Sequence, residues 1–391
     1  MMESGKAKSD AIVPNLGIES DRLISIDVAR GLIMMIMALD HASVTWNEGR
    51  SAFEAGLPPI ETVAYSGLAQ QITREVTHIC APGFQLLAGL GLALSVGRRQ
   101  ERGVNPWRIS ADMALRAGVL FFCEWVLLHL AMGRVWFFFG VLCCIGSSML
   151  LFSVLRFLPR WLIGVGSLGV LLAAPYYCPQ RVVDPSAGQY LANVWTTVAL
   201  PSEQMATAWW VLYPVLPWVG IFGLGWFWGA WYADRSGKRL AWLTAAGIGI
   251  FLAGVLLRWF GGAYGDRLPG GEAGPWSARF WALSKYPPTP AFSMMTLGVM
   301  LALLGALRPL DYAQRLHRLW RAPVVFGRVA LFFYLIHFYL YGAYPVLSGT
   351  FQGHSLATTW IVWLVGLGLL WPVCRAYGRA RQRHPAVLRY F

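Results

Sequence analysis

The chain has 391 residues, of which 57% are hydrophobic and only 13% are charged, and its mean hydropathy is +0.50. A soluble domain of this length needs more charge to cover its surface, so the composition excludes an ordinary water-soluble enzyme and indicates an all-α membrane protein. The net charge of +13 comes from short Lys/Arg clusters between apolar segments, a pattern that favours membrane topology signals over a nucleic-acid-binding patch.

A window of about 19 residues finds roughly ten apolar segments that are long enough to cross a bilayer. In chain order they are Ile24–His41, Val76–Val96, Ile109–Leu130, Val135–Leu155, Trp161–Tyr177, Trp209–Trp231, Leu240–Phe260, Ala291–Leu307, Val324–Tyr344 and Leu356–Val373. We therefore predict a polytopic membrane helix bundle with about ten transmembrane helices.

The basic residues predict how this bundle is oriented. Every cluster follows an even-numbered span, on the side that also holds Lys6, Lys8 and Arg22. Because basic residues concentrate on the cytoplasmic side, we predict that residues 1–22 and 375–391 are cytoplasmic tails and that residues 23–374 form the transmembrane domain. The N-terminal segment has no apolar signal core, so we expect the first span to remain as an anchor.

Three long segments lie on the opposite side of the predicted bundle. They are Ala42–Glu75, Cys178–Ala208 and Gly261–Pro290, and they are rich in Gly, Pro, Trp and Tyr but poor in Lys and Arg. Long ordered loops over a bundle usually carry function. We therefore expect the chemistry to reach the extracytoplasmic side.

The inner end of the first span carries Asp27 and Arg30, three residues apart on one helical face. A charge in the bilayer core costs at least about 2.5–3.5 kcal/mol, so such residues are expected to pair, to face a cavity or to function. One interpretation is a local ion pair. The other is that Arg30, followed by the small Gly31 and supported by Arg116 in the third span, lines a cytoplasmic mouth for an anionic ligand.

The outer end of the same span carries Asp40 and His41, and the second span opens with Arg74, Glu75 and His78. Imidazole is the side chain best suited to move protons near neutral pH, and a neighbouring carboxylate can orient it. These groups meet at one depth on consecutive helices, which is typical of a proton-handling site. The alternative is structural, with Asp40 as a helix-end cap and His78 as an interfacial residue.

Two more ionisable residues lie near predicted spans. Lys285 precedes the eighth span in "SKYPPTPAF", and His337 lies in the middle of "LFFYLIHFYL". His337 is buried on any interpretation, either as a hydrogen-bonded core histidine or as part of a site. The sequence has no phosphate-binding loop, nucleophile elbow or metal-spaced His/Cys/Asp set, so we expect no metal cofactor, and we interpret the six Cys as small buried hydrophobes.

Five segments together resemble a known family. They are "RLISIDVARGLIMMIMALDH", "ITREVTHICAPGFQLLAGLGLALS", "WVLYPVLPWVGIFGLGWFWG", "LSKYPPTPAFSMMTLG" and "FGRVALFFYLIHFYL". In this order they are similar to the bacterial relatives of heparan-alpha-glucosaminide N-acetyltransferase, from about Arg22 to Tyr344. The resemblance implies a transmembrane acyltransferase in the bacterial cytoplasmic (inner) membrane.

The resemblance also implies the substrates and partners. Acetyl-CoA or another acyl-CoA is expected to enter from the cytoplasm, and the acyl group to pass to an extracytoplasmic acceptor such as a glycan or amino sugar. Membrane lipids are the remaining partners, no nucleic acid is expected, and a homodimer is compatible with the pattern. On this basis the substrate- and donor-binding candidates are Arg30, Arg116, Arg74, Glu75, Lys285 and His337.

The chain departs from the lysosomal enzyme at two positions of the expected site. The helix that corresponds to the first span ends there with an Asn-Tyr pair, where this chain has Asp40 and His41. The catalytic His of that enzyme lies in the loop before the second span, and the corresponding place here, near Leu68, has none. The proton-handling role is therefore expected at His41, supported by Asp40, with His78 as the second candidate.

Two other classes of protein remain compatible with these residues. A secondary transporter also carries buried charges, but it is expected to show broken helices in paired halves, and the sequence has no such internal repeat. A membrane assembly protein without catalysis would place no chemical demand on His41 or His78. Transfer of label from acetyl-CoA to an acceptor distinguishes the acyltransferase from both.

Overall fold

Each of the ten predicted spans contains a helix in the computed structural model. The structure describes residues 23–50, 67–128, 130, 137–178, 182–183, 187–200, 209–233, 239–265, 274–312 and 319–388. The predicted tail of residues 1–22 lies outside these ranges. The span helices are α1 (Ile24–Trp46), α2 (Leu68–His78), α3 (Cys80–Glu101), α4 (Pro106–Phe122), α6 (Val141–Leu155), α7 (Arg160–Tyr177), α9 (Val215–Ala233), α10 (Arg239–Phe260), α12 (Pro290–Leu307), α13 (Arg321–Arg328), α14 (Ala330–Ser348) and α15 (Leu356–Arg383).

Shorter elements connect these helices. A π-helix, η3 (Cys123–Leu128), continues α4, and a small sheet of order β1-β4-β3-β2 lies between helices of the bundle. The other elements are α8 (Ala187–Thr196), α11 (Ala278–Trp281), α16 (Pro385–Leu388), η4 (Gly262–Tyr264), η6 (Arg308–Asp311), β1 (Phe137–Phe139), β2 (Val182–Val183), β3 (Ala199–Leu200) and β4 (Trp209–Val211). β1 pairs in parallel with β4, so the fourth and sixth predicted spans begin as short strands rather than as helix.

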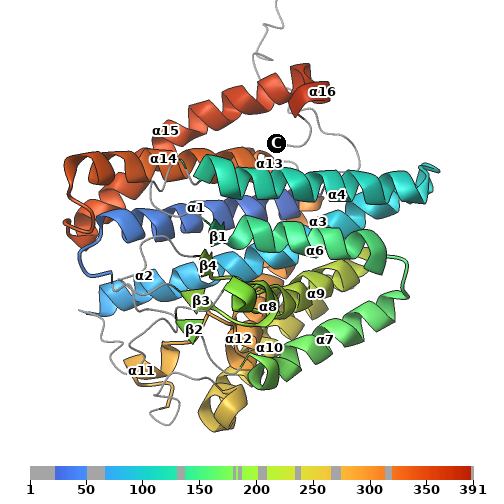
Figure 1. Ribbon diagram of the computed structural model, residues 1–391, viewed down its shortest axis with the longest axis horizontal. Helices are drawn as coiled ribbons and strands as arrows, with labels where there is room; N and C mark the ends of the chain where they lie inside the picture. Colours follow the sequence, from blue (N-terminus) through green and yellow to red (C-terminus); the bar gives the residue numbers. More distant parts are fainter. Residues whose placement is uncertain are drawn as a thin grey trace, which may run out of the picture.

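The first and ninth predicted spans, which contain α1 and α14, can be compared in direction. α1 and α14 run in the same direction, because His41 contacts His337 while Trp46, farther along α1, stacks on Tyr344. Figure 1 shows most helices side by side, with the end of α1 and the turn between α14 and α15 at the left and the turn between α3 and α4 at the right. We call the left end, which holds His41, the outer end, and the opposite end, which holds Arg30, the inner end.

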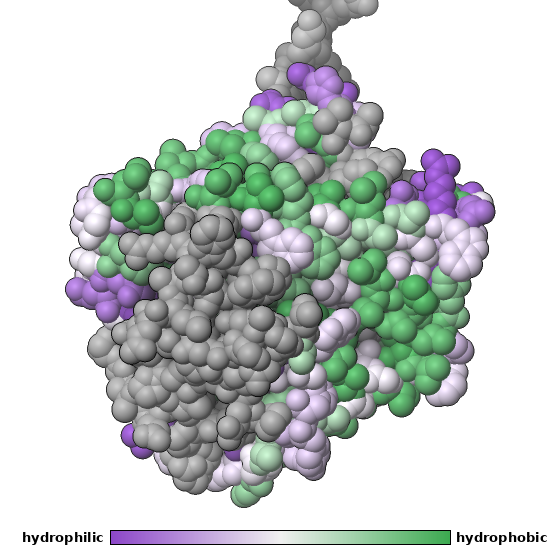
Figure 2. Space-filling view, viewed as in Figure 1, coloured by the Kyte–Doolittle hydropathy of each residue, from purple (hydrophilic) through white to green (hydrophobic). Residues whose placement is uncertain are grey.

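The flanks of the bundle are apolar. α15 presents an exposed stripe at helical spacing, formed by Ile361, Leu364, Val365 and Leu369, which are each more than half exposed. Figure 2 shows green, apolar surface over much of the described part of one face. Among the described residues, 5 helices are long and apolar enough to cross a membrane. The predicted all-α membrane bundle is confirmed, and the protein is an integral membrane protein.

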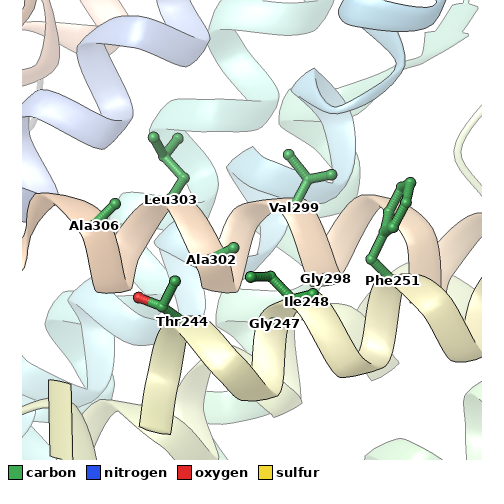
Figure 3. Close-up of a pocket in the computed structure, with 9 residues that line it drawn as sticks. All are labelled: Thr244, Gly247, Ile248, Phe251, Gly298, Val299, Ala302, Leu303 and Ala306. Atoms are coloured by element: carbon green, nitrogen blue, oxygen red, sulfur yellow. The ribbon is translucent and has the colours of Figure 1, made fainter. Parts of the chain in front are cut away.

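Small residues allow α10 and α12 to pack closely. A Cβ atom at Gly247 would overlap the backbone of Ala302, and one at Gly298 would overlap the backbone of Phe251. Figure 3 shows the pocket of about 440 Å³ that these two helices line. Its side chains are apolar apart from the hydroxyl of Thr244, so it offers no acid, base or cation for catalysis.

Gly31 serves helix packing. A Cβ atom there would overlap the carbonyl group of Pro323 on α13, and a Cβ atom at Gly327 would overlap the carbonyl oxygen of Asp27. The close approach that the sequence predicted at Gly31 is therefore made by the backbone of α13. This contact fixes α13 beside the charged inner end of α1.

Proline explains why the second span is interrupted. Pro82 has no N–H group, so it cannot bond the carbonyl of His78 in the usual helical pattern. The helix is broken at this point: α2 ends at His78 and α3 begins at Cys80. The last two turns of α2 contact the outer end of α1, because Arg74 and Thr77 both bond the Asp40 carboxylate.

Candidate active site

His41 and His337 form a pair between α1 and α14. Their nitrogens His41 Nδ1 and His337 Nε2 are 2.6 Å apart, and the two rings lie nearly parallel, with an interplanar angle of 16°. Phe338 packs against the His41 ring with centroids 4.3 Å apart. His337 is fully buried, whereas His41 is only half-buried, so His41 is the member of the pair that a substrate can reach.

The hydrogen bonds of this pair determine where its protons lie. The carbonyl oxygen of Phe333 is 3.0 Å from His337 Nδ1, and since a carbonyl only accepts, Nδ1 carries a proton. In a neutral His337 the Nε2 atom is then an acceptor, and His41 Nδ1 donates to it. A neutral His41 therefore presents an unprotonated Nε2, which is the arrangement of a general base held by an orienting partner.

Asp40 is the acceptor at the centre of a second cluster. Its Oδ1 atom accepts hydrogen bonds from Arg50 at 2.8 Å, from Arg74 at 2.9 Å and from the Thr77 hydroxyl at 3.0 Å. Asp40 and Arg74 are both buried, with 6% and 4% of their surface exposed. The cluster joins the outer end of α1 to the last turns of α2, and the carboxylate offsets part of the positive charge of the two guanidinium groups.

The structure differs from the expected contact between Asp40 and His41. Consecutive residues on a helix point about 100° apart, so the two side chains diverge. Asp40 turns toward Arg74 on α2, and His41 turns toward His337 on α14. The residue that orients His41 is therefore His337, which the sequence had placed among the substrate- and donor-binding candidates.

His78 lies at the end of α2, near the Asp40 cluster. Its ring meets the edge of Phe292 with centroids 5.8 Å apart, and it is buried. Glu75 Oε2 is 3.1 Å from His78 Nδ1 but outside its hydrogen-bonding direction, and neither ring nitrogen has a hydrogen-bond partner within the described part of the chain. His78 thus remains a second candidate for proton transfer, without the fixed orientation of His41.

Lys285 reaches the same region from the segment before α12. The ammonium group lies over the rings of Tyr213 and Tyr286, at 5.9 Å and 5.1 Å from their centroids. The helix that it precedes, α12, carries Phe292, whose ring meets that of His78 with centroids 5.8 Å apart. The structure therefore brings His337 of the ninth predicted span beside His41, and it places Lys285 of the third predicted loop just before the helix that packs on His78.

Arg30 and Arg116 lie away from this site, on the inner half of the bundle. Arg30 Nη1 is 3.7 Å from Asp27 Oδ1 and 3.3 Å from the carbonyl oxygen of Gly327. Arg328 also approaches the Asp27 carboxylate, at 3.3 Å. The local ion pair considered for Asp27 and Arg30 is thus present, and a quarter of the Arg30 side chain stays exposed. Arg116 on α4 is half-buried.

Glu124 is a buried acid within the third predicted span. The π-helix η3 points it at the start of α6, where its Oε2 atom accepts from the backbone N–H groups of Leu142 at 2.7 Å and Cys143 at 3.1 Å. The first N–H groups of a helix have no partner within the helix, so this carboxylate caps α6 from outside. Its role in the described structure is to fix α6 against η3.

This cap predicts the stability of Glu124 variants. Glu124→Ala leaves two buried N–H groups without an acceptor, and we expect it to lower the free energy of unfolding by about 1–3 kcal/mol. Glu124→Gln keeps an acceptor oxygen, so it should lower the free energy of unfolding by less. Reversible unfolding in detergent micelles measures both variants. An equal loss of free energy in the two would show that these hydrogen bonds do not stabilise the fold.

Several residues of the outer site were not anticipated. Arg50, Thr77 and Tyr213 contribute to it, although none was a candidate by sequence. Arg50 did give a signal, because it and Arg74 are the two Lys or Arg residues of the predicted outer segment Ala42–Glu75. Tyr213 gave none, since a tyrosine at the start of an apolar span is common at membrane interfaces.

The fold and the site together define an integral membrane protein with a polar centre suited to proton transfer at one end of a helix bundle. Residues 22–258 match the family described as heparan-alpha-glucosaminide N-acetyltransferase, catalytic. The match covers more than half of the chain, which therefore belongs to this family of membrane acyltransferases. A comparison with curated proteins gave no match. Lys285 and His337 lie beyond the matched residues.

Proposed function

We propose that the protein transfers an acetyl group from acetyl-CoA, or another acyl group from its CoA ester, to an acceptor on the opposite side of the membrane. The observation that carries this proposal is the half-buried His41 with its Nδ1 atom held by His337. In the proposed reaction His41 Nε2 takes the proton of the acceptor's amine or hydroxyl, which attacks the thioester carbonyl carbon. The carbon–sulfur bond then breaks, and the CoA thiolate receives that proton from His41.

The spacing of polar groups along α1 supports a donor that enters from the inner end. Arg30 and His41 are separated by eleven positions of one helix, which corresponds to roughly 16 Å. The extended pantetheine arm of acetyl-CoA can bridge such a distance. The CoA phosphates would then lie near Arg30 and Arg116 while the thioester reaches His41.

This arrangement predicts the effect of arginine variants on donor binding. Arg30→Lys keeps the charge but loses the planar fork that grips a phosphate, so it should weaken CoA binding about tenfold. Arg30→Ala and Arg116→Ala should weaken it further. Calorimetric titration of the purified protein with CoA measures the affinity, with Arg279→Ala on α11 as the control. Unchanged affinity in both alanine variants would remove the donor-binding role.

The basic clusters support an inner-membrane location in which both termini are cytoplasmic. Reporter fusions test this orientation directly. Alkaline phosphatase, which is active only outside the cytoplasm, should be inactive after Arg102 and Arg156 and active after Arg50 and Gly349. Reversed results at any two sites would contradict the proposed topology.

The acceptor is proposed to be an extracytoplasmic glycan or amino sugar, in line with the family. The test is to incubate the purified protein with radiolabelled acetyl-CoA and a panel of glycans and amino sugars and to follow the label. Transfer to at least one acceptor supports the function. Absence of both transfer and CoA binding would favour a transporter or an assembly protein.

A further inference from the structure

Lys285 is a buried cation whose charge is not neutralised by its neighbours. Only 2% of its surface is exposed. Within the described ranges, no carboxylate lies within 4 Å of its ammonium nitrogen, and that nitrogen forms no hydrogen bond. A buried charge in this state is unfavourable unless an anion joins it during function.

The neighbours of Lys285 hold it without cancelling its charge. The faces of Tyr213 and Tyr286 attract the ammonium group through their ring electrons. The two tyrosines are perpendicular, and their hydroxyl oxygens are 3.1 Å apart, so a hydrogen bond between them fixes both rings. Asp40, the buried acid at the outer end of α1, already accepts hydrogen bonds from Arg50 and Arg74.

We propose that the ammonium group of Lys285 stabilises the oxyanion that forms when the acceptor attacks the thioester carbonyl. This inference rests on the proposed acyl transfer. As the new bond to carbon forms, the π electron pair of the C=O double bond moves to the oxygen atom. The ammonium group of Lys285 then attracts the negative charge on that oxygen. When the C=O bond is restored, the thiolate leaves and the charge leaves with it.

The position of Lys285 suits this role. A preorganised charge in a dry site is most effective where negative charge develops in the transition state, because it needs no rearrangement at that moment. Lys285 lies in the segment that leads directly into α12, and Phe292 in the first turn of that helix packs on the ring of His78 with centroids 5.8 Å apart. The ground-state thioester is neutral, so the interaction strengthens during the reaction rather than during binding.

The test compares Lys285→Met with Lys285→Arg in two assays. One is acetyl transfer to an acceptor found by the panel above, and the other is hydrolysis of acetyl-CoA without acceptor, in which water attacks the same carbonyl. Lys285→Met should lower both rates by about a hundred- to a thousand-fold, the loss typical for an oxyanion-stabilising group. Lys285→Arg, which keeps a cation, should retain part of the activity, and Arg279→Met on α11 is the matched control.

The outcomes separate this role from others. CoA affinity and the unfolding temperature of Lys285→Met should stay at or above the wild-type values, because an apolar side chain replaces a buried charge. If Lys285→Met cannot be purified, Lys285→Gln takes the place of that variant in both assays. Loss of transfer with unchanged hydrolysis would overturn the proposal, because Lys285 would then bind the acceptor rather than the oxyanion. Unchanged rates in both assays would also overturn it. A wild-type protein without either activity would instead contradict the proposed function.

Discussion

Replacing His41 by alanine should lower the rate of acetyl transfer by about a hundred- to ten-thousand-fold, the usual contribution of a positioned general base. CoA binding should remain nearly intact, because the phosphates would bind at the inner end of α1. The measurement is the initial rate of transfer at saturating acetyl-CoA together with the CoA affinity. His384→Ala is the matched control, since it removes an exposed imidazole at the end of α15.

His337 should act through His41, and its variants can show this. His337→Ala leaves His41 free to rotate or to change its tautomer, so we expect a smaller loss than for His41→Ala. His337→Gln offers an amide oxygen that accepts the proton on His41 Nδ1, and it should recover part of the rate. A merely structural role would lower the unfolding temperature of both variants equally and give no recovery by glutamine.

His78 provides the competing outcome. If His78→Ala loses transfer while His41→Ala keeps it, the last turn of α2 carries the chemistry and the pair of His41 with His337 is structural. If both variants keep the wild-type rate, the base lies elsewhere. Each variant must elute as a folded protein from size-exclusion chromatography before its rate is compared.

The helices could be predicted from the sequence because membrane spans depend on local composition. Length and hydropathy located ten apolar segments, each of which contains a helix, and 5 helices among the described residues are long and apolar enough to cross a membrane. What composition could not predict was the local interruption of helices. The short strands β1 and β4 at the start of two spans depend on pairing between distant segments. The break after His78 follows from one proline, which a hydropathy window averages away.

The site was predicted in its parts but not in its pairing. His41, Asp40, Arg74 and His78 were candidates because ionisable groups are expensive in a membrane and their depth could be estimated from span edges. The partner of His41 is 296 residues away in the chain, and only the packing of α14 along α1 brings it near. The neighbouring Asp40 was the expected partner because proximity in sequence was the only information on contact. Helix geometry turns it toward Arg74 instead.

The second large effect is expected on stability, at Asp40. Asp40→Ala removes a carboxylate that two guanidinium groups share in a buried site, and it should lower the free energy of unfolding by about 3–5 kcal/mol. If Asp40 were only a helix-end cap, the loss would be about 0.5–2 kcal/mol. Asp40→Asn keeps the shape of the acceptor and should fall between wild type and alanine. Reversible unfolding in mixed micelles measures all three proteins.

A double-mutant cycle with Arg74→Met assigns this loss to the ion pair. Once the carboxylate is absent, replacing Arg74 removes a buried charge that has lost its main acceptor, so the double variant should be clearly more stable than the sum of the single losses predicts. The matched control is Asp112→Ala, which breaks the pair of Arg99 and Asp112 at the inner end, where both side chains are 25% exposed. There we expect a loss of about 0–1 kcal/mol, because water screens a partly exposed pair. Additive losses at Asp40 and Arg74 would mean that the two residues stabilise the outer end independently, and that the cluster is not what holds α2 against α1.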